Sequence, residues 1–298
     1  MDRRQFTKQS AMVSAMATVA VIPGFSEILL PLKRNIKKGI YWGSIGVGKS
    51  ILEKFQAAKL AGFDGVEVMS HFDRNEVLKA RDTTGLTIPS VCGALHGKMP
   101  LSHPDPKIRE EGLAGLKVTL EDAKAYGADS ILLVPGRVSD VVSYDECWNR
   151  SVEEIKKMVP VAEKLNVNIA IENVWNNFLL SPLEAAQYVD QFQSPVIKFY
   201  FDVGNIVAYG WPEQWIRILG KRIAKVHIKE YSQKIADTQG RRAGFKVKLQ
   251  EGDVNWTAVM KALDDIGYND WTTVEMPGGD TPEGLKDLCD RLVKIIES

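Results

Sequence analysis

The sequence predicts an α/β protein of the (β/α)8, or TIM barrel, class, in which eight parallel strands close into a ring. Three observations predict it. The chain has 298 residues, and a single barrel of this kind takes about 250. Eight short apolar segments alternate with longer segments of helical periodicity. The apolar segments are nearly continuous, which is typical of parallel strands buried on both faces. We therefore expect one barrel domain at residues 33–298.

The strands and helices follow from periodicity and from helix-capping residues. Apolar residues recur at helical spacing in 50–61, and Gly62 follows where a helix would end. Pro106 stands in the first turn of a long amphipathic segment, where its missing N–H is harmless. The expected strands are 38–45, 65–70, 86–95, 130–135, 168–174, 197–202, 223–230 and 271–276. The expected helices are 50–61, 75–80, 106–126, 144–165, 182–192, 212–219, 256–266 and 282–296.

The longest stretch without an expected element is residues 231–254. It contains basic residues, among them Lys234, Arg241, Arg242 and Lys246, and several glycines. A loop of this length at the top of a barrel is usually functional, often as a lid or a substrate wall.

Composition excludes several classes of protein. Apolar residues make up 45% of the chain and charged residues 26%, which is ordinary for a globular protein with a large core. Lys plus Arg and Asp plus Glu both number 38, so we expect no nucleic-acid partner. Cys92, Cys147 and Cys289 are far apart and form no CxxC pair. A disulfide framework or a thiolate metal site is therefore not expected.

The first 32 residues have a different character. Arg3 and Arg4 are followed by Phe6 and by an uncharged, mostly small and apolar run at 10–24. This pattern resembles a twin-arginine export signal. The run is too short and too polar for a transmembrane anchor. The alternative is an amphipathic N-terminal helix that frays. We expect a leader at 1–32, a periplasmic or exported protein, and no stable membrane insertion.

Four of the apolar segments end in a side chain that can bind a metal. These side chains are Glu172, Asp202, His227 and Glu275, on the fifth to eighth strands. Adjacent strands lie about 4.8 Å apart, and active sites of barrels form at the C-terminal strand ends. Three carboxylates and one imidazole suit one divalent metal, with Mn²⁺ favoured and Mg²⁺, Co²⁺ or Zn²⁺ compatible. Taken singly, each glutamate is also compatible with a salt bridge, and the histidine with a hydrogen-bonded core position.

One further motif is interpreted as structural. Residues 43–50, GSIGVGKS, match the GxxxxGK[ST] pattern of a phosphate-binding loop. They belong, however, to the first unit of an eight-unit barrel, and no convincing partner aspartate follows a hydrophobic strand. Glycine-rich first loops are common where the chain turns tightly. We therefore expect no nucleotide binding.

Several motifs resemble the xylose isomerase-like barrel superfamily, and in particular its sugar and sugar-phosphate isomerases and epimerases. They are IENVWN, FDVGN, KVHIKEY, QEGDVNW and TVEMPGG, together with GFDGVEVM near the second strand. The likeness covers nearly everything after the leader. It implies that Glu172, Asp202, His227 and Glu275 bind one divalent metal. It also implies that the two glutamates act as acid and base on opposite faces of a sugar.

Five further residues are candidates for substrate binding at the strand ends. They are His96, Glu67, Trp175, Asn205 and Lys229. Each has an ordinary structural alternative, such as packing for Trp175 or a surface charge for Lys229. Asn205 departs from the ketose 3-epimerases, many of which have a histidine there.

The leading functional hypothesis is a divalent-metal-dependent sugar isomerase or epimerase acting through an enediolate. Export favours a non-phosphorylated sugar, because sugar phosphates are mainly cytosolic. The first alternative is a 3-keto-glycoside lyase or deglycosidase that uses the same metal site. An abasic-site endonuclease is less consistent, because such enzymes use a histidine-rich zinc cluster and this chain has four histidines. A non-catalytic sugar-binding barrel is the remaining alternative. A homodimer or a homotetramer is compatible with the sequence.

Overall fold

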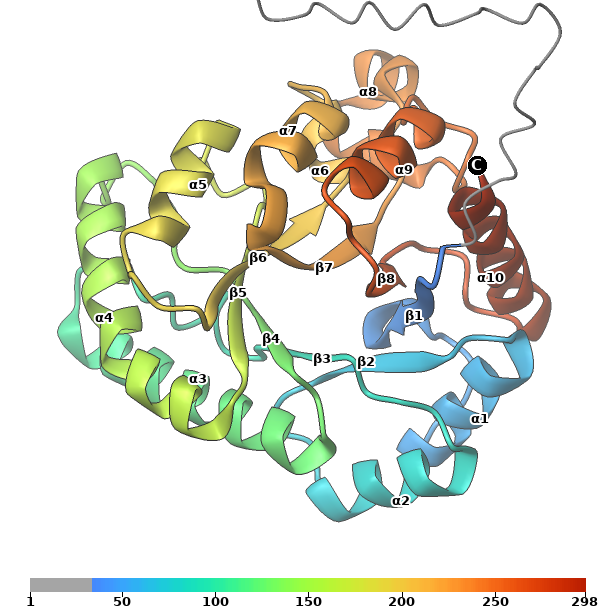
Figure 1. Ribbon diagram of the computed structural model, residues 1–298, viewed down its shortest axis with the longest axis horizontal. Helices are drawn as coiled ribbons and strands as arrows, with labels where there is room; N and C mark the ends of the chain where they lie inside the picture. The colour runs from blue at the N-terminus through green and yellow to red at the C-terminus, as the bar shows by residue number, and fades with distance from the viewer. Residues whose placement is uncertain (1–33) are drawn as a thin grey trace, which may run out of the picture. The chain divides into compact units, whose positions relative to one another are not determined.

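The computed structural model describes residues 34–298, so the expected leader lies outside the described residues. Eight parallel strands are hydrogen-bonded in chain order, and β1 closes onto β8 (Figure 1). The predicted (β/α)8 barrel is therefore confirmed. The strands are β1 Lys37–Tyr41, β2 Gly65–Met69, β3 Ser90–Cys92, β4 Ser130–Leu133, β5 Asn168–Glu172, β6 Ile197–Asp202, β7 Ile223–Ile228 and β8 Trp271–Val274.

Helices surround the ring of strands, as Figure 1 shows. They are α1 Ile51–Ala61, α2 Arg74–Thr84, α3 Pro106–Tyr126, α4 Tyr144–Leu165, α5 Pro182–Asp190, α6 Gly204–Val207, α7 Pro212–Leu219, α8 Gln233–Gln239, α9 Trp256–Asp265 and α10 Pro282–Glu297. Three 3₁₀ turns complete the set: η1 Trp42–Ser44, η2 Gly220–Arg222 and η3 Arg241–Lys246. Among the described residues, no helix combines the length and apolar character needed to cross a membrane.

Except for β6, the strands end one to four residues before their expected ends. The third strand, the second helix and residues 231–254 differ in further ways. The third strand is three residues long and begins only at Ser90, because Pro89 has no N–H to donate to a neighbouring strand. The second helix is longer than expected. The Asp73 side chain caps its start by accepting hydrogen bonds from the N–H groups of Asn75 and Glu76. The helix then continues to Thr84, with Gly85 as its C-cap. Residues 231–254 are not irregular throughout, because they contain α8 and η3.

The register of the ladder brings the strand ends of one half-barrel together. Asp202 lies directly beside His227, and Glu172 lies beside Tyr200, two residues before Asp202 on the same face. The N–H of Glu275, just beyond β8, donates to the Ile228 carbonyl at 3.1 Å. The C-terminal ends of β5 to β8 therefore face a common position.

The glycine-rich loop at residues 43–50 is built around a side chain of the chain itself. The Glu53 carboxylate accepts the N–H of Lys49 at 2.7 Å and that of Ser50 at 2.9 Å. Ser50 completes a capping box at the start of α1. Two N–H groups of this loop are thus bound by a side chain of the protein itself.

Candidate metal centre and active site

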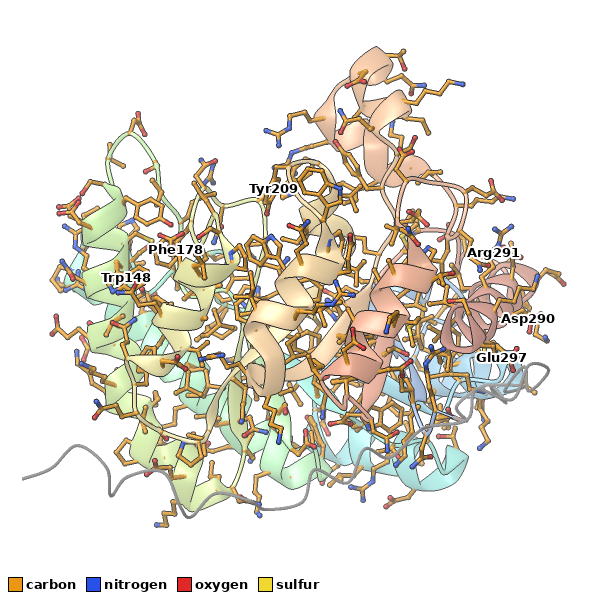
Figure 2. All side chains as sticks on the ribbon, turned by 45° about the horizontal axis from the view of Figure 1, so that its top comes forward. Trp148, Phe178, Tyr209, Asp290, Arg291 and Glu297 are labelled. Atoms are coloured by element: carbon orange, nitrogen blue, oxygen red, sulfur yellow. The ribbon has the colours of Figure 1, made fainter. Side chains whose placement is uncertain are left out.

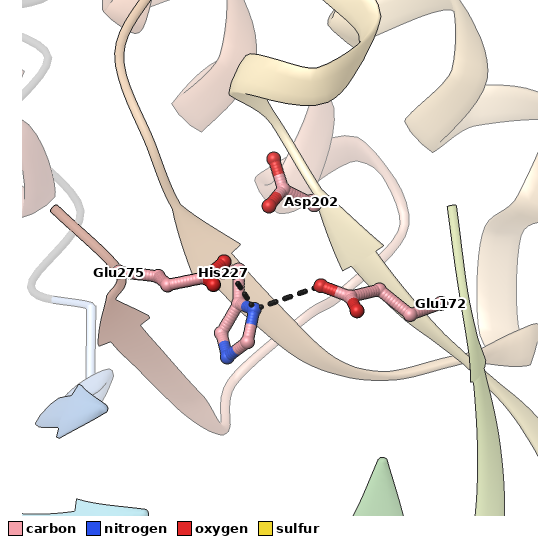
Figure 3. Close-up of side chains that lie close together, drawn as sticks. All are labelled: Glu172, Asp202, His227 and Glu275. Atoms are coloured by element: carbon pink, nitrogen blue, oxygen red, sulfur yellow. Dashed lines mark hydrogen bonds and ion pairs between the residues drawn. The ribbon is translucent and has the colours of Figure 1, made fainter. Parts of the chain in front are cut away.

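Glu172, Asp202, His227 and Glu275 meet at the C-terminal end of the barrel (Figure 3). One ligand atom from each lies within 4.8 Å of all the others. His227 Nδ1 is 3.0 Å from Glu172 Oε1 and 3.3 Å from Glu275 Oε2. Asp202 is fully buried, and Glu275 is the most open of the four, with 27% of its side chain exposed. The sequence-predicted set is therefore assembled in space.

Glu67 lies on the other side of the imidazole. Its Oε1 is 2.9 Å from His227 Nε2, and its Oε2 accepts hydrogen bonds from Ser90 Oγ and the Tyr200 hydroxyl. A neutral imidazole that donates from Nε2 leaves the lone pair of Nδ1 directed at the three other side chains. Glu67 was a candidate for contacting the substrate. In the structure its side chain is completely buried, and its carboxylate contacts His227.

The ammonium group of Lys229 lies between the carboxylates of Asp202 and Glu275. Its Nζ lies 2.9 Å from Asp202 Oδ2 and 2.5 Å from Glu275 Oε2, with 16% of the side chain exposed. Despite this proximity, neither of those buried oxygens accepts a well-formed hydrogen bond within the described residues. Strand alternation explains the position, because Lys229 follows His227 by two residues and so points to the same side.

The surroundings shift the protonation of these groups in different directions. Burial raises the pKa of Glu172 to about 7, although His227 opposes the shift. Burial also acts to raise the pKa of Glu275, but the charges of Lys229 and His227 outweigh it and hold that pKa well below its usual range. Burial opposes protonation of His227, but the charge of Glu67 and the nearby carboxylates raise its pKa well above normal. The two glutamates therefore differ strongly in acidity.

The donor set fits a divalent cation. Three carboxylates and one imidazole are oxygen and nitrogen ligands of the kind that Mn²⁺, Mg²⁺, Co²⁺ and Zn²⁺ accept. Asp202 Oδ2 and Glu275 Oε2 are buried oxygens that make no well-formed hydrogen bond in the described chain, although the Lys229 ammonium lies close to both. Buried carboxylate oxygens need a positive charge or a donor beside them, which Lys229 supplies here and a divalent cation would supply when bound.

Hydrogen bonds of two asparagine side chains link the C-terminal ends of β5 and β6. Asn173 Nδ2 donates to the Asp202 carbonyl at 2.8 Å, and Asn173 Oδ1 accepts the Asp202 N–H at 2.9 Å. Asn205 donates its N–H to Asp202 Oδ1 at 2.8 Å and its Nδ2 to the Asn173 carbonyl at 2.9 Å. Trp175 Nε1 in turn donates to the Asn205 carbonyl at 2.8 Å. Asn205 and Trp175 therefore lie beside the four ligands and are partly committed to holding them.

His96 lies apart from this cluster. Its Nδ1 accepts the Val134 N–H at 3.3 Å, and its ring lines a small cavity against α3. No hydrogen bond or ion pair among the described residues joins it to the four ligands, and burial lowers its pKa to about 4. Of the five candidate substrate residues, the structure brings Glu67, Trp175, Asn205 and Lys229 to the site.

Two residues at the site were not predicted to have a role there, namely Asn173 and Tyr200. Tyr200 precedes Asp202 by two residues, so the two-residue period of a strand already directs it into the barrel. Asn173 directly follows Glu172, but its bridge to Asp202 depends on the register between β5 and β6.

The fold and the site together define a class: (β/α)8 proteins with three carboxylates and one histidine grouped at the C-terminal strand ends. A model of one family, described as "Xylose isomerase-like TIM barrel", matches residues 55–295. The chain belongs to this family.

Several known proteins similar to this chain are named as epimerases. The L-ribulose-5-phosphate 3-epimerase UlaE of Escherichia coli O1:K1 / APEC is 28% identical over 260 residues, covering 82% of this chain and 88% of its own length. A solved D-tagatose 3-epimerase-like protein has a TM-score of 0.73 at 18% identity and covers 88% of this chain and 98% of its own. A solved L-ribulose 3-epimerase has a TM-score of 0.74 at 17% identity, with coverages of 88% and 95%. The expected isomerase class agrees with these names.

Proposed function

We propose that this protein is a divalent-metal-dependent sugar isomerase or epimerase in which Glu172 and Glu275 exchange protons with the substrate. One observation carries the proposal. Glu172 and Glu275 lie on either side of His227 in Figure 3, at 3.0 and 3.3 Å from the same imidazole nitrogen, and both border the position that fits a cation. A sugar carbon held between them would have a carboxylate on each face.

Each side chain has a defined task in this proposal. One glutamate removes the proton from the carbon next to a sugar carbonyl, and the other returns a proton to the opposite face of the resulting enediolate. Asp202 and His227 hold the cation, which we propose is Mn²⁺, with Mg²⁺, Co²⁺ or Zn²⁺ as alternatives. When bound, the cation stabilises the negative charge that develops on the sugar oxygens. Lys229 then orients a substrate hydroxyl from the rim.

We further propose that the substrate is a non-phosphorylated sugar and that the protein is exported. The arginine pair and the apolar run of the leader support export, and phosphorylated sugars are mainly cytosolic. The relative from Escherichia coli is named for a sugar phosphate, so the two substrate classes need a direct comparison. Turnover of ketopentoses and ketohexoses with and without a terminal phosphate makes that comparison, and we expect faster turnover of the unphosphorylated sugars.

Substitution of the glutamates tests the mechanism. Glu172→Gln and Glu275→Gln should each lower turnover by at least about 100-fold, since general acid–base catalysis contributes roughly 10²–10⁴-fold. Both variants should still bind the metal in calorimetry, because Asp202 and His227 remain. Glu110→Gln, at an exposed position on α3, is the matched control. Full activity in both site variants would exclude the proposed acid–base pair. Release of an aglycone from 3-oxo-glycosides, without epimerisation of free sugars, would favour a lyase instead.

A further inference from the structure

Glu230 is a buried carboxylate outside the four-residue cluster. It is completely inaccessible to solvent. Its Oε1 accepts the N–H groups of Tyr231 at 3.2 Å and Val254 at 3.1 Å. Its Oε2 accepts the N–H of Gln250 at 2.9 Å and the indole N–H of Trp256 at 2.8 Å. No cationic side chain pairs with Glu230 in the described part of the chain, so four neutral donors hold its charge.

These contacts tie together the two ends of one segment, residues 231–254, which joins β7 to α9. Tyr231 begins the segment, and Val254 ends it. The Asp253 N–H also donates to the Tyr231 carbonyl at 2.8 Å. Gly252 packs so closely that a Cβ there would lie 2.6 Å from Glu230 Oε1. A buried carboxylate is favourable only while all its donors stay in place, so Glu230 fixes the conformation of the whole segment.

The segment places two side chains against the candidate active site. The ring of Phe245 lies 4.8 Å from that of Trp175, and the Arg241 guanidinium lies 4.9 Å from the same indole. Lys229 Nζ, which contacts Asp202 and Glu275, lies 5.6 Å from the centre of the Phe245 ring. A wall of Arg241, Phe245 and Trp175 thus stands next to Lys229.

The Arg241 guanidinium lies close enough to Trp175 and Tyr209 for its charge to act at the C-terminal end of the barrel. Arg241 is exposed, its backbone carbonyl accepts the Tyr231 hydroxyl at 3.0 Å, and its guanidinium makes no ion pair with a carboxylate within 34–298. Burial, with the charge of Asp202, raises the pKa of Tyr209 to about 12, and Arg241 opposes this rise. In Figure 2, α8 and η3 stand above the barrel, and Tyr209 is labelled near the base of this projection. The guanidinium is therefore available to a substrate substituent.

We propose that Glu230 is a positioning residue, which holds residues 231–254 so that Arg241 and Phe245 form the wall selecting the part of the sugar beyond the reacting carbons. This inference rests on the proposed function for its substrate. Arg241, stacked on Trp175, offers N–H donors to distal hydroxyls, and Phe245 packs on the apolar face of the sugar chain. Within residues 34–298, no side-chain hydrogen bond or ion pair joins Glu230 to Glu172, Asp202, His227 or Glu275.

The first arm of the test measures the segment itself, without substrate. Amide hydrogen exchange in residues 233–250 should be at least about 10-fold faster in Glu230→Gln than in wild type, because an amide cannot accept from four N–H donors. Glu251→Gln is the control. It lies in the same segment but is half-exposed and pairs with Arg291 at 2.9 Å. Unchanged exchange in Glu230→Gln would overturn the positioning role.

The second arm measures selectivity between a ketohexose and a ketotetrose, which lacks the distal carbons. In Glu230→Gln the KM for the ketohexose should rise about 10-fold with kcat nearly unchanged, while the ketotetrose is hardly affected. Arg241→Met leaves the Glu230 contacts intact and should give the same selective loss without faster exchange. An equal loss for both sugars would contradict a selecting wall. A wild type that turns over no sugar contradicts the proposed function, and amide exchange alone then decides the role of Glu230.

Discussion

The two ring nitrogens of His227 have different partners, and this difference defines the candidate metal centre. Nε2 faces the Glu67 carboxylate at 2.9 Å, whereas Nδ1 faces Glu172 and Glu275 at 3.0 and 3.3 Å. A carboxylate behind a ligating histidine fixes the orientation of the ring and makes the imidazole a stronger ligand. Tyr200 and Ser90 hold that carboxylate in turn.

Glu67→Gln tests this arrangement. The amide keeps the size of the side chain but removes the negative charge behind His227, so metal affinity should fall by about 10- to 100-fold. Isothermal titration with Mn²⁺ measures the change. The exposed Glu110→Gln variant should bind as wild type does. An unchanged affinity in Glu67→Gln would mean that Glu67 has no part in orienting the ligand.

The sequence predicted the grouping of the four candidate ligands better than it predicted their hydrogen-bond partners. Glu172, Asp202 and His227 stand in order at the ends of strands, so strand position alone places them together. Glu67 lies in the middle of β2, whereas His227 lies on β7. Only the closure of the barrel brings the Glu67 carboxylate against His227 Nε2. His96 follows β3, but the turn after that short strand directs its ring toward α3.

Asn173 connects the ends of two elements, β5 and β6. Its side-chain amide both donates to and accepts from the backbone of Asp202. These two bonds extend the hydrogen bonding between β5 and β6 by one residue past the end of β5. Because these backbone groups are buried, the bridge keeps the Asp202 carboxylate at its position beside His227.

Asn173→Ala should therefore destabilise the protein. Two buried backbone groups of Asp202 would lose their partners, which costs about 1–3 kcal/mol each. We expect the free energy of unfolding, from urea titration of the metal-free protein, to fall by roughly 2–4 kcal/mol. Asn75→Ala is the control, because Asn75 is exposed in the first turn of α2. Equal stability of both variants would show that solvent replaces the bridge.

Helices with clear capping residues were predicted more reliably than loops. Asp105 and Pro106 mark the start of α3, and Gly127, with a φ of 78°, marks its end. Residues 231–254 were predicted as an irregular loop, because the helical turns there are short and their stability comes from tertiary contacts. The hydrogen bonds of Glu230 to both ends of that segment have no local sequence signal.

Two lysines of the β7 region pair with carboxylates at opposite ends of the barrel. Near the N-terminal ends of the strands, the buried Lys225 pairs with Asp129 at 2.8 Å and with Asp270 at 2.7 Å. At the C-terminal end, Lys229 is the cation that pairs with the ligand carboxylates within residues 34–298. A divalent ion that binds the folded barrel but not the unfolded chain stabilises the molecule as a whole.

Metal removal should therefore lower global stability. At a Mn²⁺ concentration of 100 times its Kd, the folded state gains about 2.7 kcal/mol. The thermal midpoint should rise with added metal and fall in the presence of a chelator. Asp202→Asn should largely lose this response. A midpoint independent of metal in the wild-type protein would contradict a metal centre at this end of the barrel.

The central claim is that Glu172 and Glu275 move protons at a sugar carbon next to a carbonyl. NMR of the metal-loaded protein with a panel of ketoses in D₂O measures this directly. The proposed chemistry predicts deuterium at the carbon beside the carbonyl of the turned-over sugar, and none with either Glu→Gln variant. Conversion of a sugar without deuterium incorporation, or equal incorporation with both variants, would contradict it.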